Sequence, residues 1–153
     1  MTMTPKRSAG DGSSGEHPVH TRGYWDAVQN GHFVLERCVE CRRYAHPPVG
    51  ACRYCGGHVE FVSSAGTGVI YSATKMFYQA VPTTIRTVPY WVAVVALDEQ
   101  DGLRIVVPVE DTPDDQVRPD APVEITIREV AAGGRRIPVA VVKAADPLPE
   151  RSP

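Results

Sequence analysis

Apolar and polar residues alternate along the second half of the chain with the period of a β-strand. Valine and isoleucine occupy every second position of residues 123–127, and the same spacing returns at residues 137–141. Such alternation is typical of a strand with one buried face. Residues 69–78 and 103–109 are rich in β-branched and aromatic residues, which strands favour. We therefore predict four strands in these segments.

A fifth segment, residues 90–97, is apolar at almost every position, which indicates a strand in the centre of a sheet. Turn residues separate the strands, with an acidic turn at 98–102 and two glycines at 133–134. Five strands in this order, without long helices between them, predict a small closed sheet. The chain is therefore predicted to be mainly β, with a five-stranded barrel of the OB type.

The first half of the chain begins with one short helical segment. Residues 21–31 predict a helix that Thr21 caps and that Asn30 and Gly31 end. A helix this short is marginal alone, so its aromatic residues must pack on this chain or on a partner. Residues 32–37 then predict a strand that leads into a cysteine pair.

All four cysteines stand in two Cys-x-x-Cys pairs separated by ten residues: Cys38, Cys41, Cys52 and Cys55. Two such pairs supply the four sulfurs of a closed tetrahedral site, for which Zn²⁺ is favoured and iron is the alternative. A closed site leaves no position for a substrate, so we predict a structural metal. We expect each pair to lie at the tip of a short hairpin, and two such turns predict a rubredoxin-like zinc ribbon. Two disulfides are a further alternative, which no secretory segment supports.

Composition and charge argue against several classes of protein. A net charge of −2 argues against a general nucleic-acid binder, because such affinity comes from neutralised phosphates. No run approaches the ~18 apolar residues of a membrane span, and the opening stretch lacks the apolar region of a signal peptide. We therefore expect a cytoplasmic protein without a membrane segment.

Basic residues gather around the cysteines, whereas residues 98–120 are acidic. The basic residues either offset the charge of four thiolates or form a patch for an anionic ligand or an acidic partner. They are Arg37, Arg42, Arg43, His46 and Arg53.

No constellation of residues predicts catalysis by this chain itself. The sequence has no nucleophile elbow, Walker loop or dinucleotide fingerprint. Gly66-x-Gly68 is too short for a phosphate loop, and indicates close backbone passage where the ribbon joins the barrel. Since four thiolates fill a tetrahedron, we expect His46 and His58 at the surface or beside the metal site. We predict no catalytic residue.

Aromatic residues with basic neighbours are the remaining candidates. Such aromatics can fill the barrel, stack on single-stranded nucleic acid or anchor a protein interface. A guanidinium can also hold the phosphates of a CoA-type ligand. The residues predicted to contact a partner or CoA are Tyr24, Trp25, Arg43, Lys75, Arg86, Tyr90 and Trp91.

The order of these motifs resembles the DUF35 family, also described as acyl-CoA-associated OB-fold proteins with a rubredoxin-like zinc ribbon. The resemblance runs from about residue 21 to residue 143. The motifs that carry it are Gly23-Tyr-Trp25, Gly31-x-Phe33, Cys38-x-x-Cys41, His46-Pro-Pro48, Cys52-x-x-Cys55, Gly66-x-Gly68-x-Ile70-Tyr71-Ser72 and Pro89-Tyr90.

The resemblance implies an auxiliary subunit without catalytic residues, with the four cysteines at the metal positions. Such proteins dock on thiolase-like or aldolase-like enzymes in a hetero-oligomer and help to form the acyl-CoA site. These enzymes include thiolases, acyltransferases and retro-aldolases of steroid side chains, and some relatives stand beside MaoC-type hydratases. The alternatives are a zinc-ribbon and OB-fold protein that binds single-stranded nucleic acid, and an electron carrier with iron at the four sulfurs.

These interpretations divide the chain into five segments. We expect a disordered tail at 1–20, the helix and lead-in strand at 21–36, the zinc ribbon at 37–64, the OB-fold domain at 65–145 and a loose tail at 146–153.

Overall fold

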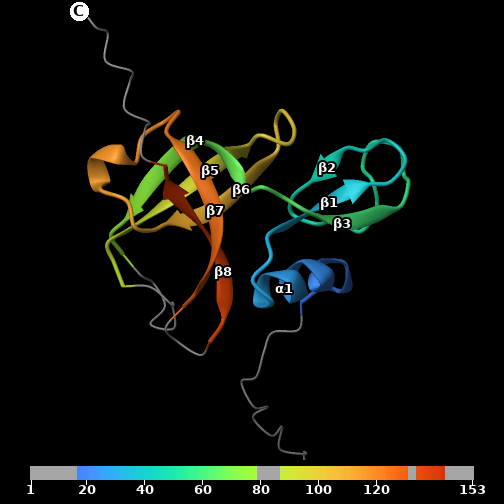
Figure 1. Cartoon of the computed structure of the whole chain (residues 1–153), viewed down its shortest axis with the longest axis horizontal. Helices are drawn as coiled ribbons and strands as arrows, with labels where there is room; N and C mark the ends of the chain where they lie inside the picture. Colours follow the sequence, from blue (N-terminus) through green and yellow to red (C-terminus); the bar gives the residue numbers. More distant parts are fainter. Residues whose placement is uncertain (1–16, 79–86, 131–133, 144–153) are drawn as a thin grey trace, which may run out of the picture.

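The computed structural model describes residues 17–78, 87–130 and 134–143, which form two β-sheets and one α-helix. A three-stranded sheet lies at one end and a closed five-stranded barrel at the other, with the helix beside both (Figure 1). The predicted fold class, a mainly β chain with a helix, a ribbon and a barrel, is confirmed. The tail predictions for residues 1–16 and 144–153 lie outside the described residues.

The helix and the three-stranded sheet form the ribbon end of the molecule. Helix α1 spans Arg22–Gln29, and the strands are β1 (Val34–Cys38), β2 (Tyr44–Ala45) and β3 (Val59–Ser63). The strands pair antiparallel in the order β2–β1–β3. Strand β1 therefore lies in the middle, and its last residue opens the first cysteine turn.

The barrel consists of the five predicted strands. They are β4 (Thr67–Met76), β5 (Tyr90–Leu97), β6 (Arg104–Val109), β7 (Pro122–Glu129) and β8 (Arg136–Val142). The order around the barrel is β4–β5–β6–β8–β7, and β4 also pairs with β7. The β6–β8 pair is parallel and the others are antiparallel. Closure leaves each strand with two neighbours, the arrangement of an OB barrel.

Small aliphatic side chains fill the barrel. Ile70, Val95, Val107, Val123 and Ala140 are each at most 2 % exposed. They come from all five strands, and they belong to one core cluster that continues into the helix and β1. The period-two pattern therefore predicted the inner face of β7, where Val123 and Ile125 are buried.

Strand β8 differs from the expectation that its alternating residues face the barrel core. Ile125 pairs directly with Ala140, and Thr126 pairs with Val139. Opposite residues in an antiparallel pair share a face, so Val139 points away from the interior that Ile125 fills. Val139 is nevertheless fully buried, and α1 lies against β8. Both faces of β8 are therefore covered.

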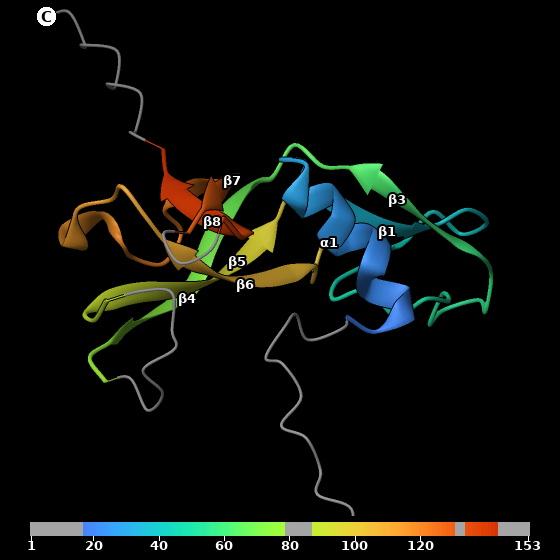
Figure 2. The same cartoon turned by 90° about the horizontal axis from the view of Figure 1, so that it is seen from below.

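Helix α1 and the three-stranded sheet lie at one end of the molecule and the barrel at the other (Figure 2). Hydrogen bonds connect the two ends. Gln29 of α1 donates to the Arg136 carbonyl at 2.9 Å and accepts from the Arg136 N–H at 3.1 Å. Gln100, in the β5–β6 turn, accepts from the Tyr44 N–H at 2.9 Å and donates to the Tyr44 carbonyl at 3.3 Å. The two ends are therefore held by paired contacts at two places.

The chain crosses from ribbon to barrel through a tight segment. Ser64 donates to the Glu99 carboxylate and accepts from the Gly66 N–H. Gly66 has a φ of +69°, and a Cβ there would lie 2.9 Å from the Ile125 carbonyl oxygen. A Cβ at Gly68 would overlap the β5 backbone. The prediction of close backbone passage at these glycines is confirmed.

The predicted start of the helix is wrong in one detail. Thr21 stands at the N-cap position of α1, but its side chain makes no capping hydrogen bond, because its hydroxyl donates to the Pro18 carbonyl at 2.9 Å within a 3₁₀ turn at Val19–Thr21. The predicted end is confirmed, since Gly31 has a φ of +85°. Within the described residues, no helix has the length and apolar character that crossing a membrane requires.

Candidate metal centre

The first cysteine pair forms a turn at the end of β1. The Cys38 N–H donates to the Arg43 carbonyl at 2.9 Å, and the Arg42 N–H donates to the Cys38 carbonyl at 3.1 Å. Arg42 adopts a left-handed φ of +64°. The Cys41 N–H lies 3.4 Å from the Cys38 sulfur and donates to it. This turn brings both sulfurs of the pair to the same side.

The second pair repeats the same turn. The Cys52 N–H donates to the Gly57 carbonyl at 3.0 Å, and the Gly56 N–H donates to the Cys52 carbonyl at 2.9 Å. Gly56 takes the left-handed position with a φ of +76°, as Arg42 does in the first turn. The Tyr54 N–H donates to the Cys52 sulfur at 3.4 Å. Two matching turns therefore face each other.

The four sulfurs converge on one point. The Sγ atoms of Cys38 and Cys55 lie 3.5 Å apart, as do those of Cys41 and Cys52. All four lie within 4.8 Å of one another. A tetrahedron with Zn–S bonds of about 2.3 Å has sulfurs about 3.8 Å apart, so the geometry fits one metal ion. A disulfide needs about 2.05 Å, so the alternative of two disulfides does not fit these separations.

Backbone groups around the sulfurs favour thiolates on one side of the site. The N–H groups of Cys55 and Tyr54 lower the pKa of Cys52 to about 6. Burial acts in the opposite direction on Cys38 and raises its pKa. Because metal binding requires deprotonated sulfurs, the N–H donors prepare Cys52 as a ligand, and the charge of an ion would compensate the buried thiolate of Cys38.

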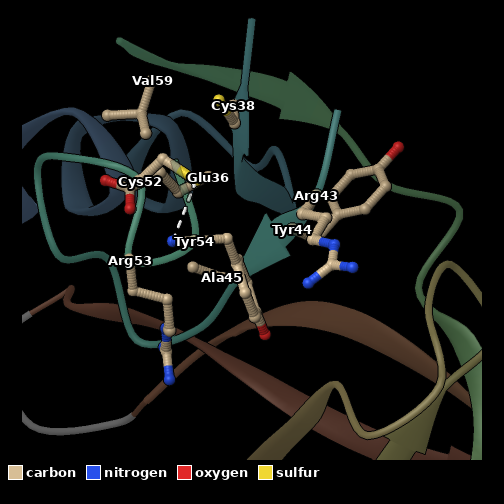
Figure 3. A pocket seen from close by; sticks show the side chains of 9 residues that line it. All are labelled: Glu36, Cys38, Arg43, Tyr44, Ala45, Cys52, Arg53, Tyr54 and Val59. Carbon is tan, nitrogen blue, oxygen red and sulfur yellow. Dashed lines mark hydrogen bonds between the residues drawn. The ribbon is translucent and has the colours of Figure 1, made fainter. Parts of the chain in front are cut away.

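The space beside the sulfurs has no room for an organic substrate. Cys38 and Cys52 are buried, whereas Cys41 and Cys55 are exposed. Figure 3 shows the side chains that line a pocket of about 10 Å³ next to Cys38 and Cys52, among them Arg43, Arg53 and Tyr54. An ion with four sulfur ligands would have no open coordination position there, which is the arrangement of a structural site.

A buried carboxylate holds the loop between the two cysteine pairs. Glu36 in β1 is 1 % exposed, and its two carboxylate oxygens accept from the N–H groups of Val49 and Gly50, both at 2.9 Å. A buried carboxylate is tolerated when its oxygens are hydrogen-bonded. Sequence reasoning missed Glu36, because a single acidic residue in a short strand gives no signal that it is buried.

The predicted basic residues are distributed among separate contacts. Arg37 pairs with Glu60 at 2.8 Å, and Arg42 lies 4.0 Å from the same carboxylate. The Arg43 guanidinium lies over the Tyr54 ring, 4.4 Å from its centroid. These cations therefore have partners within the ribbon.

A larger pocket lies between the ribbon and the β5–β6 turn. Its volume is about 130 Å³, and its lining includes His46, Arg53, Gln100, Asp101 and Arg104. Two of the predicted basic residues, His46 and Arg53, thus line the same pocket as Arg104 of the barrel. Asp101 adds a carboxylate, so the pocket is polar but of mixed charge.

The aromatic residues of α1 pack mainly inside this chain. Tyr24 is 3 % exposed, and burial raises its pKa. Its ring lies 5.4 Å from that of His46, whose pKa burial lowers to about 4. Trp25 is half-buried and stacks on His17 at 4.9 Å. The Tyr24 ring is therefore part of the core, and Trp25 keeps an accessible edge.

The other predicted contact residues lie at the far end of the barrel. Lys75 and Trp91 form a cross-strand pair, and both bind Asp114: Lys75 as an ion pair, and Trp91 through its indole N–H at 2.7 Å. These donors lower the pKa of Asp114, with Lys75 the larger cause. Tyr90 is half-buried nearby, and Arg86 lies outside the described residues. The structure thus separates this group from Arg43.

Two family descriptions match the chain in sequence order. The rubredoxin-like zinc ribbon domain of ChsH2 matches residues 25–62, and the C-terminal OB-fold domain of ChsH2 matches residues 61–128. Together these matches cover well over half of the 153 residues. They include all four cysteines, β4 to β6 and β7 up to residue 128.

Similar proteins extend this comparison. A solved structure described as an "Ltp2-ChsH2(DUF35) aldolase" is 28% identical, with a TM-score of 0.74, over 84% of this chain and 98% of that chain. A DUF35-family protein of unknown function from Sulfolobus solfataricus is 16% identical, with a TM-score of 0.52, over 82% of this chain and 86% of that chain, and supports the fold alone.

One curated relative shares sequence with about half of the chain. A probable enoyl-CoA hydratase alpha subunit from Thermomonospora curvata is 34% identical over 84 residues. The match covers 54% of this chain but only 25% of the relative. The matched part of this chain therefore corresponds to about a quarter of that longer protein.

Proposed function

The chain belongs to the DUF35 family with the two-domain architecture of ChsH2. From this membership we propose that it is a non-catalytic auxiliary subunit of a thiolase-like or aldolase-like enzyme that acts on acyl-CoA substrates. The observation that carries the proposal is the similarity to the Ltp2-ChsH2(DUF35) aldolase. That similarity extends over 98% of the matched chain, so it includes both the ribbon and the barrel.

The chemistry of the cysteine site agrees with this proposal. Four thiolates directed at one ion leave neither a free nucleophile nor an open coordination position. The proposed metal is Zn²⁺, held by Cys38, Cys41, Cys52 and Cys55, and its contribution is to the fold of the ribbon. Metal analysis and colour distinguish zinc from iron, because a red, redox-active protein would favour the electron carrier.

The acyl-CoA site is proposed to be shared between this subunit and its partner. We propose that the subunit helps to complete the acyl-CoA site of its partner, and that a MaoC-type hydratase associates with some assemblies. The similarity to a hydratase alpha subunit supports an acyl-CoA context. The ribbon at residues 37–64 and the OB domain at 65–145 are the proposed functional modules.

The test is reconstitution with a purified partner. Affinity capture from the native host, guided by the neighbouring genes, identifies the thiolase-like chain, and each chain is then assayed alone and mixed on acyl-CoA substrates. We expect turnover to depend on both chains. Turnover by this chain alone at the rate of the mixture would overturn the proposal.

A further inference from the structure

The outer face of β5 and β6 is apolar although it lies outside the barrel core, and Ser72 and Thr74 of β4 border it as polar residues. Pairing across these strands places Val94 beside Val106, and Val92 beside Pro108. These residues alternate along their strands with buried residues of the interior, so they point outward. The register shift between Ile70 and Ser72 adds Tyr71 to the same surface. We call Tyr71, Val92, Val94, Val106 and Pro108 the apolar face.

Large side chains of the apolar face are accessible. Val106 is 66% exposed and Tyr71 is 55% exposed. The Arg104 guanidinium lies over the Tyr71 ring, 3.7 Å from its centroid, at the edge of the face. An exposed tyrosine held by an arginine has the composition of interface residues that contribute most to binding.

The opposite side of the barrel has a different surface. On β7, Glu124 pairs with Lys143 and Arg128 pairs with Asp111. The outward Val139 on β8 is covered, with α1 lying against that strand. The chain therefore exposes charge or adds a helix on that side, whereas no described element packs as a layer over the apolar face. A surface of this kind indicates an interaction site.

The charges around the apolar face favour a protein over a nucleic acid. Strands β5 and β6 are the second and third strands of the barrel, the face on which OB folds bind ligands. A nucleic acid needs several cations spread over such a face, whereas the cations Arg104 and Arg53, which line one pocket, lie at its ribbon edge. Acidic segments at 98–101 and 110–115 flank β6 and so border its two ends, with Asp111 and Asp114 of the second segment paired to Arg128 and Lys75. These borders fit a partner with basic residues around an apolar centre, and they would repel each other if two copies paired symmetrically.

We propose that the apolar face is the surface on which the thiolase-like subunit docks, with a matching apolar surface bordered by lysine and arginine. This inference rests on the proposed function and adds the location of the contact. Val94 and Val106 form a cross-strand pair within it, and Arg104 lies over the Tyr71 ring at its edge.

Substitutions on two exposed valines test the location. Val106→Lys places a charge in the apolar face, and Val49→Lys makes the same change at a 43% exposed valine on the ribbon. The probe is the purified thiolase-like chain, with binding measured by calorimetry. We expect Val106→Lys to raise the dissociation constant at least about tenfold, and Val49→Lys to change it less than about twofold. Tyr71→Ala provides a second loss of about tenfold without an added charge.

Each variant is first checked for native circular dichroism and metal content. Equal binding by folded Val106→Lys, Tyr71→Ala and the parent chain would overturn the docking surface while leaving the proposed function intact. Failure of the parent chain to bind any thiolase-like protein would overturn both. A homodimer that Val106→Lys dissociates in sedimentation would assign the face to a second copy, and salt-dependent binding of single-stranded oligonucleotides at this face would assign it to nucleic acid. Either result contradicts the proposal.

Discussion

The ribbon and the barrel of this chain are stabilised in different ways. The barrel closes on itself, so the backbone hydrogen-bonding groups of its strands pair with those of neighbouring strands. The strands surround a core of small aliphatic residues. The ribbon has a strand of two residues, a buried carboxylate in its central strand and four thiols at its tip. A sheet this small buries little apolar surface, so a metal ion must supply what the core cannot. The comparison shows why one chain needs cysteines in one half only.

Loss of a metal ligand is expected to have the largest effect, and to unfold the ribbon but not the barrel. Cys38→Ser removes one of four ligands, and structural zinc contributes about 10 kcal/mol or more to small sites. We expect loss of metal and unfolding of the ribbon, while far-ultraviolet circular dichroism keeps most of the barrel strand signal. Loss of all strand signal would mean that the contacts of Gln29 and Gln100 make the two regions one cooperative unit.

The next effect concerns the barrel core. Ile70 is fully buried, and Ile70→Ala leaves a cavity that destabilises by about 2–5 kcal/mol. We expect a lower urea midpoint with unchanged metal content in the folded protein. Val106→Ala on the outside of the same barrel is the matched control, with a change of about 0.5 kcal/mol or less. Equal losses for both substitutions would contradict the assignment of inner and outer faces.

His46 makes the ribbon sensitive to acid. Burial lowers the pKa of His46 from 6.5 to about 4, so the unfolded chain binds its proton first as the pH falls. The stability from the neutral imidazole is complete above pH 6.5, and roughly 2 kcal/mol is lost between pH 6.5 and 5. His46→Gln should show a flatter pH dependence of thermal unfolding over that range. Protonation of the thiolates affects both proteins alike, so identical slopes would contradict the buried neutral imidazole.

Glu36 is the smaller electrostatic contribution to the ribbon. Glu36→Gln turns an amide NH₂ toward one of the two N–H groups that the carboxylate accepts from, at a cost of about 1–3 kcal/mol. Hydrogen exchange at Val49 and Gly50 should become faster. Glu60→Gln, which breaks an exposed pair with Arg37, is the control, with a loss below about 1 kcal/mol. Unchanged exchange in Glu36→Gln would contradict the described contacts.

The smallest effect compares the two cysteine turns with each other. Arg42 and Gly56 hold equivalent left-handed positions, but only Gly56 is a residue that favours them. We expect Arg42→Gly to stabilise and Gly56→Ala to destabilise the ribbon, each by about 1 kcal/mol. Opposite shifts of the thermal midpoint would confirm the equivalence, and shifts of the same sign would contradict it.

The features predicted from sequence are those with a repeated local signal. Four cysteines at fixed spacing indicate one metal site. Runs rich in β-branched and apolar residues identified three of the barrel strands, and alternation of apolar residues identified the other two. The left-handed conformation of Arg42 could also have been predicted, because aligning the two cysteine turns places Arg42 at the position of Gly56. The sequence therefore predicted the two modules and the ligands.

The remaining features depend on contacts between distant segments. The burial of Glu36 arises only when the loop at residues 49–50 folds over β1. Tyr24 was predicted as a partner contact, but its burial follows from the packing of α1 on this chain. The apolar strand β5 was predicted for a sheet centre, and only closure of the barrel shows that one of its faces points outward. Pattern alone could not distinguish these outcomes.

The most direct test of the different stabilisation of the two regions is hydrogen exchange of the full chain with metal bound and after chelation. We expect chelation to remove protection from residues 34–38 and 59–63, while residues 92–96 and 123–127 stay protected. Equal loss of protection in both regions, or a ribbon that remains protected without metal, would contradict the account.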